Sequence, residues 1–501
     1  MTDIPILTIL VFLPAVGALA ILLMGRTNSS VRSIAATTVL LNFALSIGLW
    51  IAFDGSANHA GAIDGVTYQA DGLNFVERFS WISRIGAEYF LGVDGLSMPL
   101  VVLTNLLSVA AIFASWRVEN RAREYFIWLL ILQTSVLGVF TSLDFLLFFL
   151  FWELELIPMY MLISVWGTGR HEYSAMKFLL FTLGAGAALL IALLVLFFSN
   201  GSFDMVGLSH LGASGALESS ILAGPAICGL LLFAFAIKLP IVPLHTWLPD
   251  AHTDAPTAVS IMLAGVLLKM GGYGLLRLNI GLFPDVMESW GFALSILAAI
   301  SVIYGALITL KQTDLKRLVA FSSVSHMGLV TLGVASMNQL GVAGASLQMF
   351  THGTITGLLF LLVGIVYDKA HTRHIPDLGG IAQRMPFTAA VFVIAGAASL
   401  GLPATSGFVA EITVFLGGFE AWKIATIVSA IGIVLAAGYI LWTLERVLFG
   451  PPNQHFANLT DVKAIDAFPM ILLTVAIIGI GIYPTIILNI LNPSIASLLG
   501  S

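Results

Sequence analysis

Long apolar runs separated by short polar segments dominate the hydropathy pattern of this 501-residue chain. A helix needs roughly 20 apolar residues to cross a bilayer, because each residue adds only about 1.5 Å to its length. Fourteen runs reach about that length, near residues 5–24, 31–53, 93–115, 125–142, 145–166, 177–199, 222–247, 257–279, 291–310, 318–336, 341–367, 387–418, 423–449 and 467–491. The pattern predicts an all-α polytopic membrane protein with about 14 transmembrane helices.

The composition supports this prediction, since 58% of the residues are hydrophobic and only 10% are charged. A soluble domain is usually about 25% charged. The single cysteine, Cys228, excludes disulfides within one chain and cysteine-ligated iron–sulfur clusters. With so few charges, each polar residue inside a span can be considered individually.

The positions of Lys and Arg predict an orientation. Loops after odd-numbered spans hold fifteen of the 21 Lys and Arg, loops after even-numbered spans hold four, and Lys238 and Lys269 lie within spans. Basic loops stay on the cytoplasmic side. We therefore expect both termini on the non-cytoplasmic side, and we expect the polar segment 54–92 to lie along that outer surface as a loop.

Four charged residues fall inside the predicted spans: Glu153, Lys238, Lys269 and Glu411. A charge at the bilayer centre costs at least ~2.5–3.5 kcal/mol on insertion scales. Single members of this set could lie nearer an interface or form structural ion pairs. Because burial and neighbouring charges shift the proton affinity of such groups in opposite directions, the four together favour a proton path.

Histidines add possible relays to this path. His326 and His352 fall within spans ten and eleven, and imidazole exchanges protons near neutral pH. A lone buried histidine is also often structural, so both interpretations stay open. His245 follows Lys238 by seven residues, but two prolines interrupt the helical count, and we expect His252 to lie in a loop.

Two spans contain helix breakers. Pro240 and Pro243 follow Lys238, and the segment 399–408, "SLGLPATSGF", precedes Glu411. Proline removes a helical hydrogen bond, and transporters use such breaks to place polar groups at mid-membrane. We expect the first break to give Lys238 water and carbonyl partners. Two breaks five spans apart also suggest an inverted repeat, although the spacing of the Leu-Pro pairs differs from that of the charges.

Several motifs resemble one known family. They are "FWELELIPMY", "FAIKLPIVPLHTWLPDAHTDAPTAVS", "LLKMGGYGLLR", "FSSVSHMGLV" and "GLPATSGFVAE". Together they resemble the antiporter-like subunits of respiratory complex I, NADH–quinone oxidoreductase, and among these the subunit 4 type, chain M. A glutamate in span twelve and the absence of a long lateral helix after span fourteen support that type.

The resemblance implies a domain organisation. Residues 1–115 would hold helices 1–3, residues 125–279 the first five-helix repeat (helices 4–8), residues 291–449 the second, inverted repeat (helices 9–13), and residues 467–501 helix 14. Helices 7 and 12 would be the broken ones.

The resemblance also implies which residues move protons: Glu153, Lys238, Lys269, His326, His352 and Glu411. Glu155 has no such role in the family. Residues i and i+2 point about 200° apart on a helix, so Glu153 and Glu155 cannot both face Lys238. We therefore expect Glu153 to face Lys238 and Glu155 to pair with another helix or a loop arginine.

The implied function is proton translocation coupled to quinone reduction elsewhere in complex I, in a bacterial inner (plasma) membrane. NADH, FMN, iron–sulfur clusters and quinone would belong to partner subunits, which include sibling antiporter-like subunits. The chain itself carries no dinucleotide-binding, P-loop or metal-ligand motif, and no nucleic-acid partner is expected. Two alternatives remain: a subunit of a multisubunit cation/proton antiporter, and a passive scaffold whose charges are structural.

Overall fold

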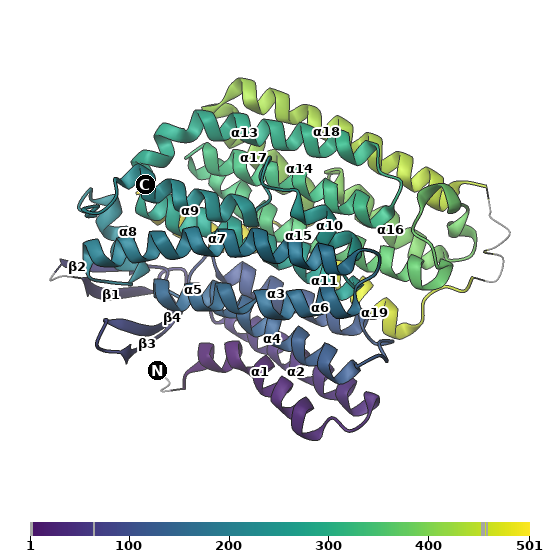
Figure 1. Cartoon of the computed structure of the whole chain (residues 1–501). Coiled ribbons are helices and arrows are strands. Elements are labelled where there is room, and N and C mark those ends of the chain that lie inside the picture. The colour runs from purple at the N-terminus through teal and green to yellow at the C-terminus, as the bar shows by residue number, and fades with distance from the viewer. Residues whose placement is uncertain (1–3, 64–65, 452–455, 457–458, 501) are drawn as a thin grey trace.

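The computed structural model describes residues 4–63, 66–451, 456 and 459–500. The chain is mostly helical, and the helices lie side by side with two β-hairpins at one end (Figure 1). The first half contains α1 (Ile6–Met24), α2 (Asn28–Ile51), α3 (Met98–Ala114), α4 (Ala122–Thr141), α5 (Phe145–Leu154), α6 (Leu156–Trp166), α7 (His171–Asn200), α8 (Met205–Ala213), α9 (Gly224–Lys238), α10 (Trp247–Asp254), α11 (Thr257–Met262), η1 (Leu263–Leu267), α12 (Leu268–Gly274) and η2 (Leu275–Ile280).

The second half continues the same arrangement. It contains α13 (Pro284–Leu310), α14 (Leu315–Ala335), α15 (Gln339–Ala370), η3 (Ile375–Asp377), η4 (Ile381–Gln383), α16 (Pro386–Ser399), α17 (Ser406–Ala421), α18 (Lys423–Leu444), η5 (Glu445–Phe449), α19 (Ala464–Ile482) and α20 (Thr485–Leu498). Within the described residues, eleven helical stretches are long and apolar enough to cross a membrane, and four shorter apolar helices accompany them. The chain is thus an integral membrane protein.

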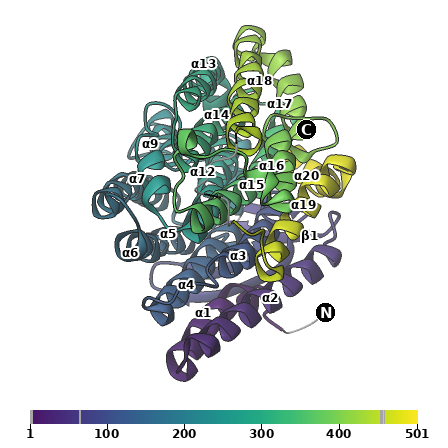
Figure 2. The ribbon, with the colours of Figure 1, turned by 90° about the vertical axis from the view of Figure 1, so that its right-hand side faces the viewer.

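Three stretches form the centre of the molecule. The continuous helix from α11 to η2, together with α14 and α15, is buried along its most apolar window. Helices α1, α2 and α4 lie on one side of this centre, and α13 and α18 lie on the other (Figures 1 and 2). Because the central helices are shielded from lipid by their neighbours, polar side chains on them can contact each other rather than hydrocarbon.

The segment expected to be a loop, 54–92, instead forms two antiparallel hairpins. Strands β1 (Asn58–Ile63) and β2 (Val66–Asp71) pair with each other, as do β3 (Asn74–Ile82) and β4 (Ala87–Val93). The Glu77 carboxylate accepts a hydrogen bond from the Leu7 amide at 2.6 Å, which ties β3 to the start of α1. Strand β4 ends at Val93, where the third span was predicted to begin, and the helix begins only at Met98.

The first predicted break lies between α9 and α10. Helix α9 ends at Lys238, and side chains satisfy backbone groups that the break releases. The Trp247 indole donates to the Ile237 carbonyl at 2.9 Å, and Ser301 Oγ accepts from the Val242 amide at 3.1 Å. These bonds meet the requirement that polar backbone inside a membrane protein finds partners.

The second predicted break lies between α16 and α17. Gly401 has a φ of +73°, a left-handed conformation that glycine adopts without strain. A Cβ at Gly401 would lie 2.6 Å from Glu411 Oε2, so the missing side chain also leaves room for that carboxylate. A further interruption was not predicted: residues 467–491 divide into α19 and α20 at Tyr483 and Pro484.

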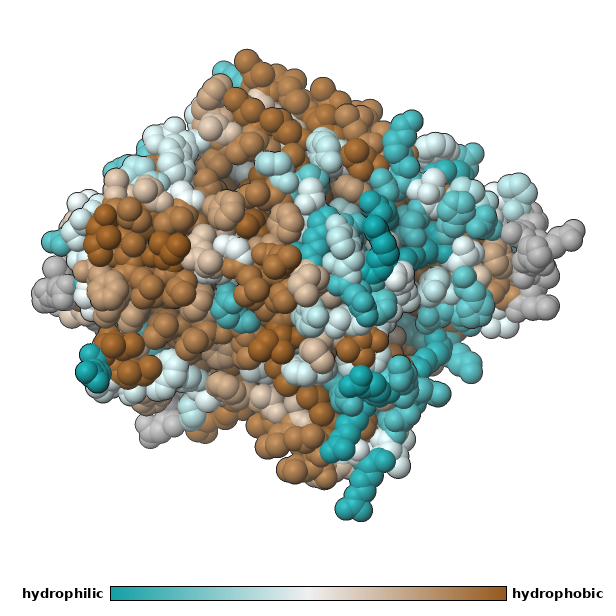
Figure 3. All heavy atoms as spheres, in the orientation of Figure 1, coloured by the Kyte–Doolittle hydropathy of each residue, from teal (hydrophilic) through white to brown (hydrophobic). Residues whose placement is uncertain are grey.

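The two ends of the molecule differ in polarity. Hydrophilic residues gather at the end opposite the hairpins (Figure 3). Helix α1 begins, and α20 ends, near the hairpins, where Ser494 Oγ accepts from the Gly95 amide at 2.9 Å. Both terminal helices therefore meet the same end of the bundle, which fits an even number of crossings.

Candidate functional site

Lys238 forms an ion pair with Glu155, and neither side chain has exposed surface. The Lys238 ammonium contacts Glu155 Oε1 and lies 5.2 Å from the centre of the Trp152 ring and 5.7 Å from that of Phe178. An ammonium buried without a counter-charge would be very costly. The carboxylate and the two ring faces provide that compensation.

The expectation that Glu153 faces Lys238 is wrong. The two glutamates do point in different directions, as their spacing requires, but Glu155 is the residue that turns toward α9. It lies at the junction where α5 ends and α6 begins. Glu153 instead points toward α7, where a Cβ on Gly186 would overlap its Oε1, and that oxygen has no hydrogen-bond partner within the described chain. Water and carbonyl partners were expected for Lys238, and the partner that the structure shows is the Glu155 carboxylate.

Lys269 lies at mid-helix between two π-helical segments, η1 and η2. Such wide turns occur frequently at functional sites. The Lys269 ammonium donates to the Ala264 carbonyl and lies 2.8 Å from His352 Nδ1. Its contacts are therefore a neutral carbonyl and an imidazole, and no ion pair involves it within the described residues.

From His352 the polar contacts continue to Glu411. The rings of His352 and His326 have centroids 5.6 Å apart. His326 Nδ1 lies 3.3 Å from Glu411 Oε1, and His326 Nε2 lies 3.4 Å from Ser399 Oγ. A cavity of about 10 Å³ lies among His326, His352 and Glu411. That volume is about the space one water molecule occupies.

The structure thus brings four of the six predicted residues into one run: Lys269, His352, His326 and Glu411. Lys238 lies outside this run but close to it, because α12 packs against the break. A Cβ on Gly271 would lie 2.7 Å from the Leu239 amide nitrogen. Glu153 lies beyond Lys238, on the side of α7.

His252 was expected in a loop, and this expectation is wrong. It lies in the short helix α10, has no exposed surface, and stacks on Phe360 of α15 at a centroid distance of 4.7 Å. Neither of its ring nitrogens has a hydrogen-bond partner within the described chain. The burial of His252 could not be predicted from the sequence, because the proline-rich segment before it resembles a solvated loop.

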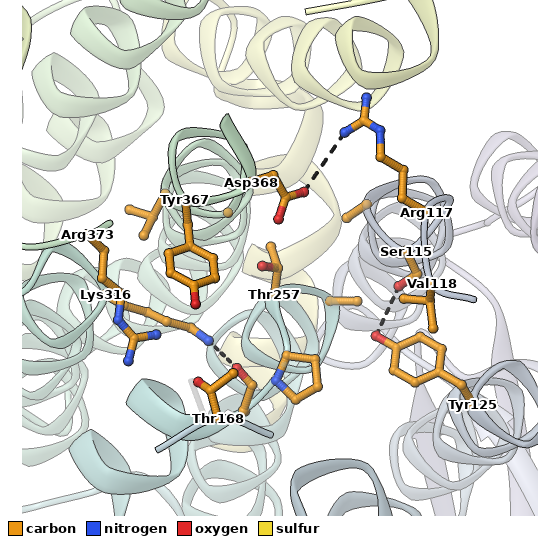
Figure 4. A pocket seen from close by; sticks show the side chains of 16 residues that line it. Ser115, Arg117, Val118, Tyr125, Thr168, Thr257, Lys316, Tyr367, Asp368 and Arg373 are labelled. Atoms are coloured by element: carbon orange, nitrogen blue, oxygen red, sulfur yellow. Dashed lines mark hydrogen bonds and ion pairs between the residues drawn. The ribbon is translucent and has the colours of Figure 1, made fainter. Parts of the chain in front are cut away.

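A polar cavity of about 240 Å³ lies next to the end of α10, where Ala255 is one of its lining residues (Figure 4). Lys316, Arg373, Arg117 and Asp368 line it, and Arg117 and Asp368 approach within 3.9 Å. The sequence placed Lys316 in a loop, but it lies in the first turn of α14 with 5% of its surface exposed. Its ammonium donates to the Ala255 carbonyl, next to the end of α10.

Comparison with known proteins places the chain in a family. The profile of the family described as "NADH:quinone oxidoreductase/Mrp antiporter, TM" matches residues 142–436. NADH-quinone oxidoreductase subunit M of Rickettsia prowazekii is 39% identical over 100% of this chain and 99% of its own length. NAD(P)H-quinone oxidoreductase chain 4 1 of Synechococcus elongatus is 42% identical over 96% of this chain and 89% of its own.

Solved structures share the fold. A chain of respiratory complex I from Thermus thermophilus with bound NADH superposes with a TM-score of 0.87 and 27% identity, covering 99% of this chain and 100% of that one. A chain of the Mrp complex from Dietzia sp. DQ12-45-1b reaches a TM-score of 0.83 at 19% identity, over 98% of this chain and 97% of that one. The second likeness concerns the fold alone. The chain therefore belongs to the NADH:quinone oxidoreductase/Mrp antiporter transmembrane family.

Proposed function

We propose that the chain is the proton-translocating, subunit M type membrane component of a complex I-like NADH–quinone oxidoreductase. One observation carries the proposal: Lys269, His352, His326 and Glu411 form a run of titratable groups through the buried centre of the molecule. Burying four titratable groups inside a membrane protein costs free energy, so such groups are normally fully paired or have a function. The full-length identity to relatives named as subunit M or chain 4 supports the same function.

The contacts suggest how a proton moves along the run. Lys269 can donate to His352 Nδ1, because the two atoms are 2.8 Å apart. His352 Nε2 has no partner within the described chain, so the ring can pass a proton onward from its other nitrogen. One water fits the small cavity toward His326, and His326 Nδ1 then lies within reach of Glu411. The Glu411 carboxylate is the last group in this part of the path, which begins at Lys269.

The Lys238–Glu155 pair controls a second part of the path, which consists of Lys238, Glu155 and Glu153. While the pair is closed, the ammonium is held against the Glu155 carboxylate. If the pair opens, or if Glu155 is neutralised, Lys238 can release a proton. Glu153 then offers a second carboxylate two residues away. The Glu153 oxygen that faces α7 has no hydrogen-bond partner within the described chain. Glu153 is therefore the group through which a neighbouring subunit could act on the Lys238–Glu155 pair.

Protons reach the run from the basic end of the molecule. The 240 Å³ cavity provides room for water, and Lys316 lines it. His252 lies buried beyond it, with both ring nitrogens free of partners in the described part of the chain. This cavity would face the cytoplasm of a bacterial cell, with the hairpins and both termini on the opposite side of the inner membrane.

The chain supplies no redox chemistry in this proposal. NADH, FMN, iron–sulfur clusters and quinone belong to partner subunits, and sibling antiporter-like subunits adjoin this one in the membrane. The enzyme activity is therefore that of the whole translocase, and this chain contributes the proton path.

A subunit of a multisubunit cation/proton antiporter is the second candidate function. The fold likeness to the Mrp complex chain favours it, but at 19% identity. The 39–42% identity to the quinone oxidoreductase relatives favours the first candidate.

Purification of the tagged chain in mild detergent separates these two functions. A complex I subunit should co-purify with iron–sulfur proteins and with NADH oxidation that reduces a quinone. Small membrane partners alone, with sodium–proton exchange in vesicles, would identify an antiporter. A passive scaffold would assemble normally and translocate protons normally when Lys269 is replaced by methionine.

A further inference from the structure

An apolar groove of about 620 Å³ runs along the outer face of the molecule between α13 and α18. Its α13 wall includes Phe292, Ile296, Ile300 and Leu307, which recur at helical spacing and face outward. This surface is hydrophobic and lies at the top of the molecule in Figure 3. Both helices are long enough to cross a membrane, so the groove lies at the level of the bilayer.

The shape of the groove follows from how the two helices pack. They run in the same direction, since Phe292 lies near Trp422 and Leu310 lies near Gly438. They approach closely where Val302 meets Gly432, whose missing side chain permits the contact. Toward their starts the floor includes the small residue Ala425. Phe292 and Leu307 are about 22 Å apart along a helix, more than one leaflet of a hydrocarbon core of about 30 Å.

Two charged residues lie close along the chain to the lining residues at the start of the groove, one in each helix. Lys423 begins α18, is exposed, and forms no ion pair within the described chain. Glu288 is also exposed and unpaired there, one helical turn before Phe292 on the same face of α13. The Phe292 and Trp422 rings, 6.0 Å apart, lie between these two positions. A cation and a carboxylate at one mouth match the phosphate and the amine of a zwitterionic headgroup.

We propose that the α13–α18 groove binds a phospholipid of the phosphatidylethanolamine class. One acyl chain fills the groove, Lys423 binds the phosphate, and Glu288 binds the amine. Trp422 lies at the depth of the headgroup, where aromatic residues are enriched in membrane proteins. Its indole donates a 2.7 Å hydrogen bond to the Ala335 carbonyl, which fixes its orientation. The start of the groove lies at the end of the bundle that carries the hairpins (Figure 1).

Photo-crosslinking tests this proposal on the assembled complex that contains the chain. The probe is phosphatidylethanolamine with a diazirine in one acyl chain, and labelled peptides are mapped by mass spectrometry. We expect labels on residues 292–307 and 424–428. Ala425→Phe, which fills the floor, should abolish them, while Val434→Phe, at an exposed position of α18 outside the groove, should not.

Two surface variants keep the test decisive if Ala425→Phe fails to fold. Lys423→Gln and Glu288→Gln should each lower the labelling by about two- to fivefold, the range expected for one exposed ionic contact. Equal labelling by the matching phosphatidylglycerol probe would overturn the choice of headgroup. Absence of label from both helices in the intact complex would mean that a partner subunit covers the groove, and would overturn the proposal itself. Neither outcome depends on whether the chain moves protons.

Discussion

Lys238 and Lys269 are both fully buried lysines, but their partners differ. Lys238 is held by the Glu155 carboxylate and two aromatic rings. Lys269 contacts only a carbonyl and the His352 imidazole. A lysine in an ion pair is held by its counter-charge, whereas a lysine beside an imidazole has a partner nitrogen that can accept a proton. The comparison suggests that the first lysine acts as a gate and the second as a relay.

The two helix breaks differ in where the nearby charged residue lies. Lys238 is the last residue of the helix before its break, whereas Glu411 lies in the helix after its break, beside Gly401. The first break is closed by side-chain bonds from Trp247 and Ser301. The second borders the cavity that one water would fill. The breaks therefore serve different ends of the path, even though they look alike in the sequence.

The largest expected effect comes from breaking the ion pair. Lys238→Met leaves the Glu155 carboxylate buried without its partner, which typically costs ~3–5 kcal/mol. We expect less assembled complex and no proton uptake by inverted membrane vesicles. The double variant Lys238→Met/Glu155→Leu removes both charges, so it should recover assembly, measured by native gel electrophoresis, but not uptake. Recovery of uptake in the double variant would show that the pair is only structural.

The relay should be interrupted by His352→Phe, which keeps an aromatic ring but removes both nitrogens. We expect normal assembly and a drop in proton uptake of about tenfold or more, since positioned acid–base groups contribute factors of this size or larger. Thr356→Val is the matched control, because Thr356 lies 3.5 Å from the same imidazole. An uptake rate near that of wild type in His352→Phe would exclude His352 from the path.

Glu153→Gln distinguishes the two neighbouring glutamates. It leaves no charge unpaired, because Glu153 forms no ion pair within the described residues, so assembly should be unchanged. Uptake should fall several-fold if Glu153 is the second carboxylate of the gate. Glu155→Gln should instead reduce assembly as well as uptake, by isolating the Lys238 ammonium. Identical behaviour of the two variants would contradict the separate roles.

The smallest effect is expected from Ser399→Ala. It removes the hydroxyl 3.4 Å from His326 Nε2, a long contact worth at most about 1 kcal/mol. Uptake should fall by no more than a few-fold, with full assembly. A complete loss in this variant would mean that Ser399, rather than Glu411, orients the histidine.

The residue pattern predicted the helical fold, both breaks and the buried charges Lys269 and Glu411, whereas the resemblance to a known family pointed to His326 and His352. Apolar runs, prolines and charges within spans are easy to recognise in a sequence, because each costs free energy in the wrong environment. The partner of Lys238 could not be predicted in the same way. Periodicity shows that Glu153 and Glu155 face apart, but it does not show which of them faces α9 when the helix changes course at Glu155.

His252 and the hairpins were missed for related reasons. A short polar helix after a proline break resembles a loop, and α10 is buried by packing against α7 and α14 and by the stacking of His252 on Phe360 of α15. The 54–92 segment is polar enough to suggest a solvated connection, but its hairpins also contact distant residues, since Leu91 forms a bridge with Ser142 and Glu77 bonds to Leu7. In both cases contacts distant in the sequence decide the structure.

The most direct test of the account measures proton uptake by vesicles during NADH oxidation, normalised to assembled complex, for Glu411→Gln and Glu411→Lys. Glutamine keeps the size of the side chain but cannot accept a proton from His326, so uptake should fall strongly while assembly stays normal. Lysine restores a titratable group at the same place and should recover part of the uptake. Equal uptake by the wild type and Glu411→Gln would contradict a path that ends at this carboxylate.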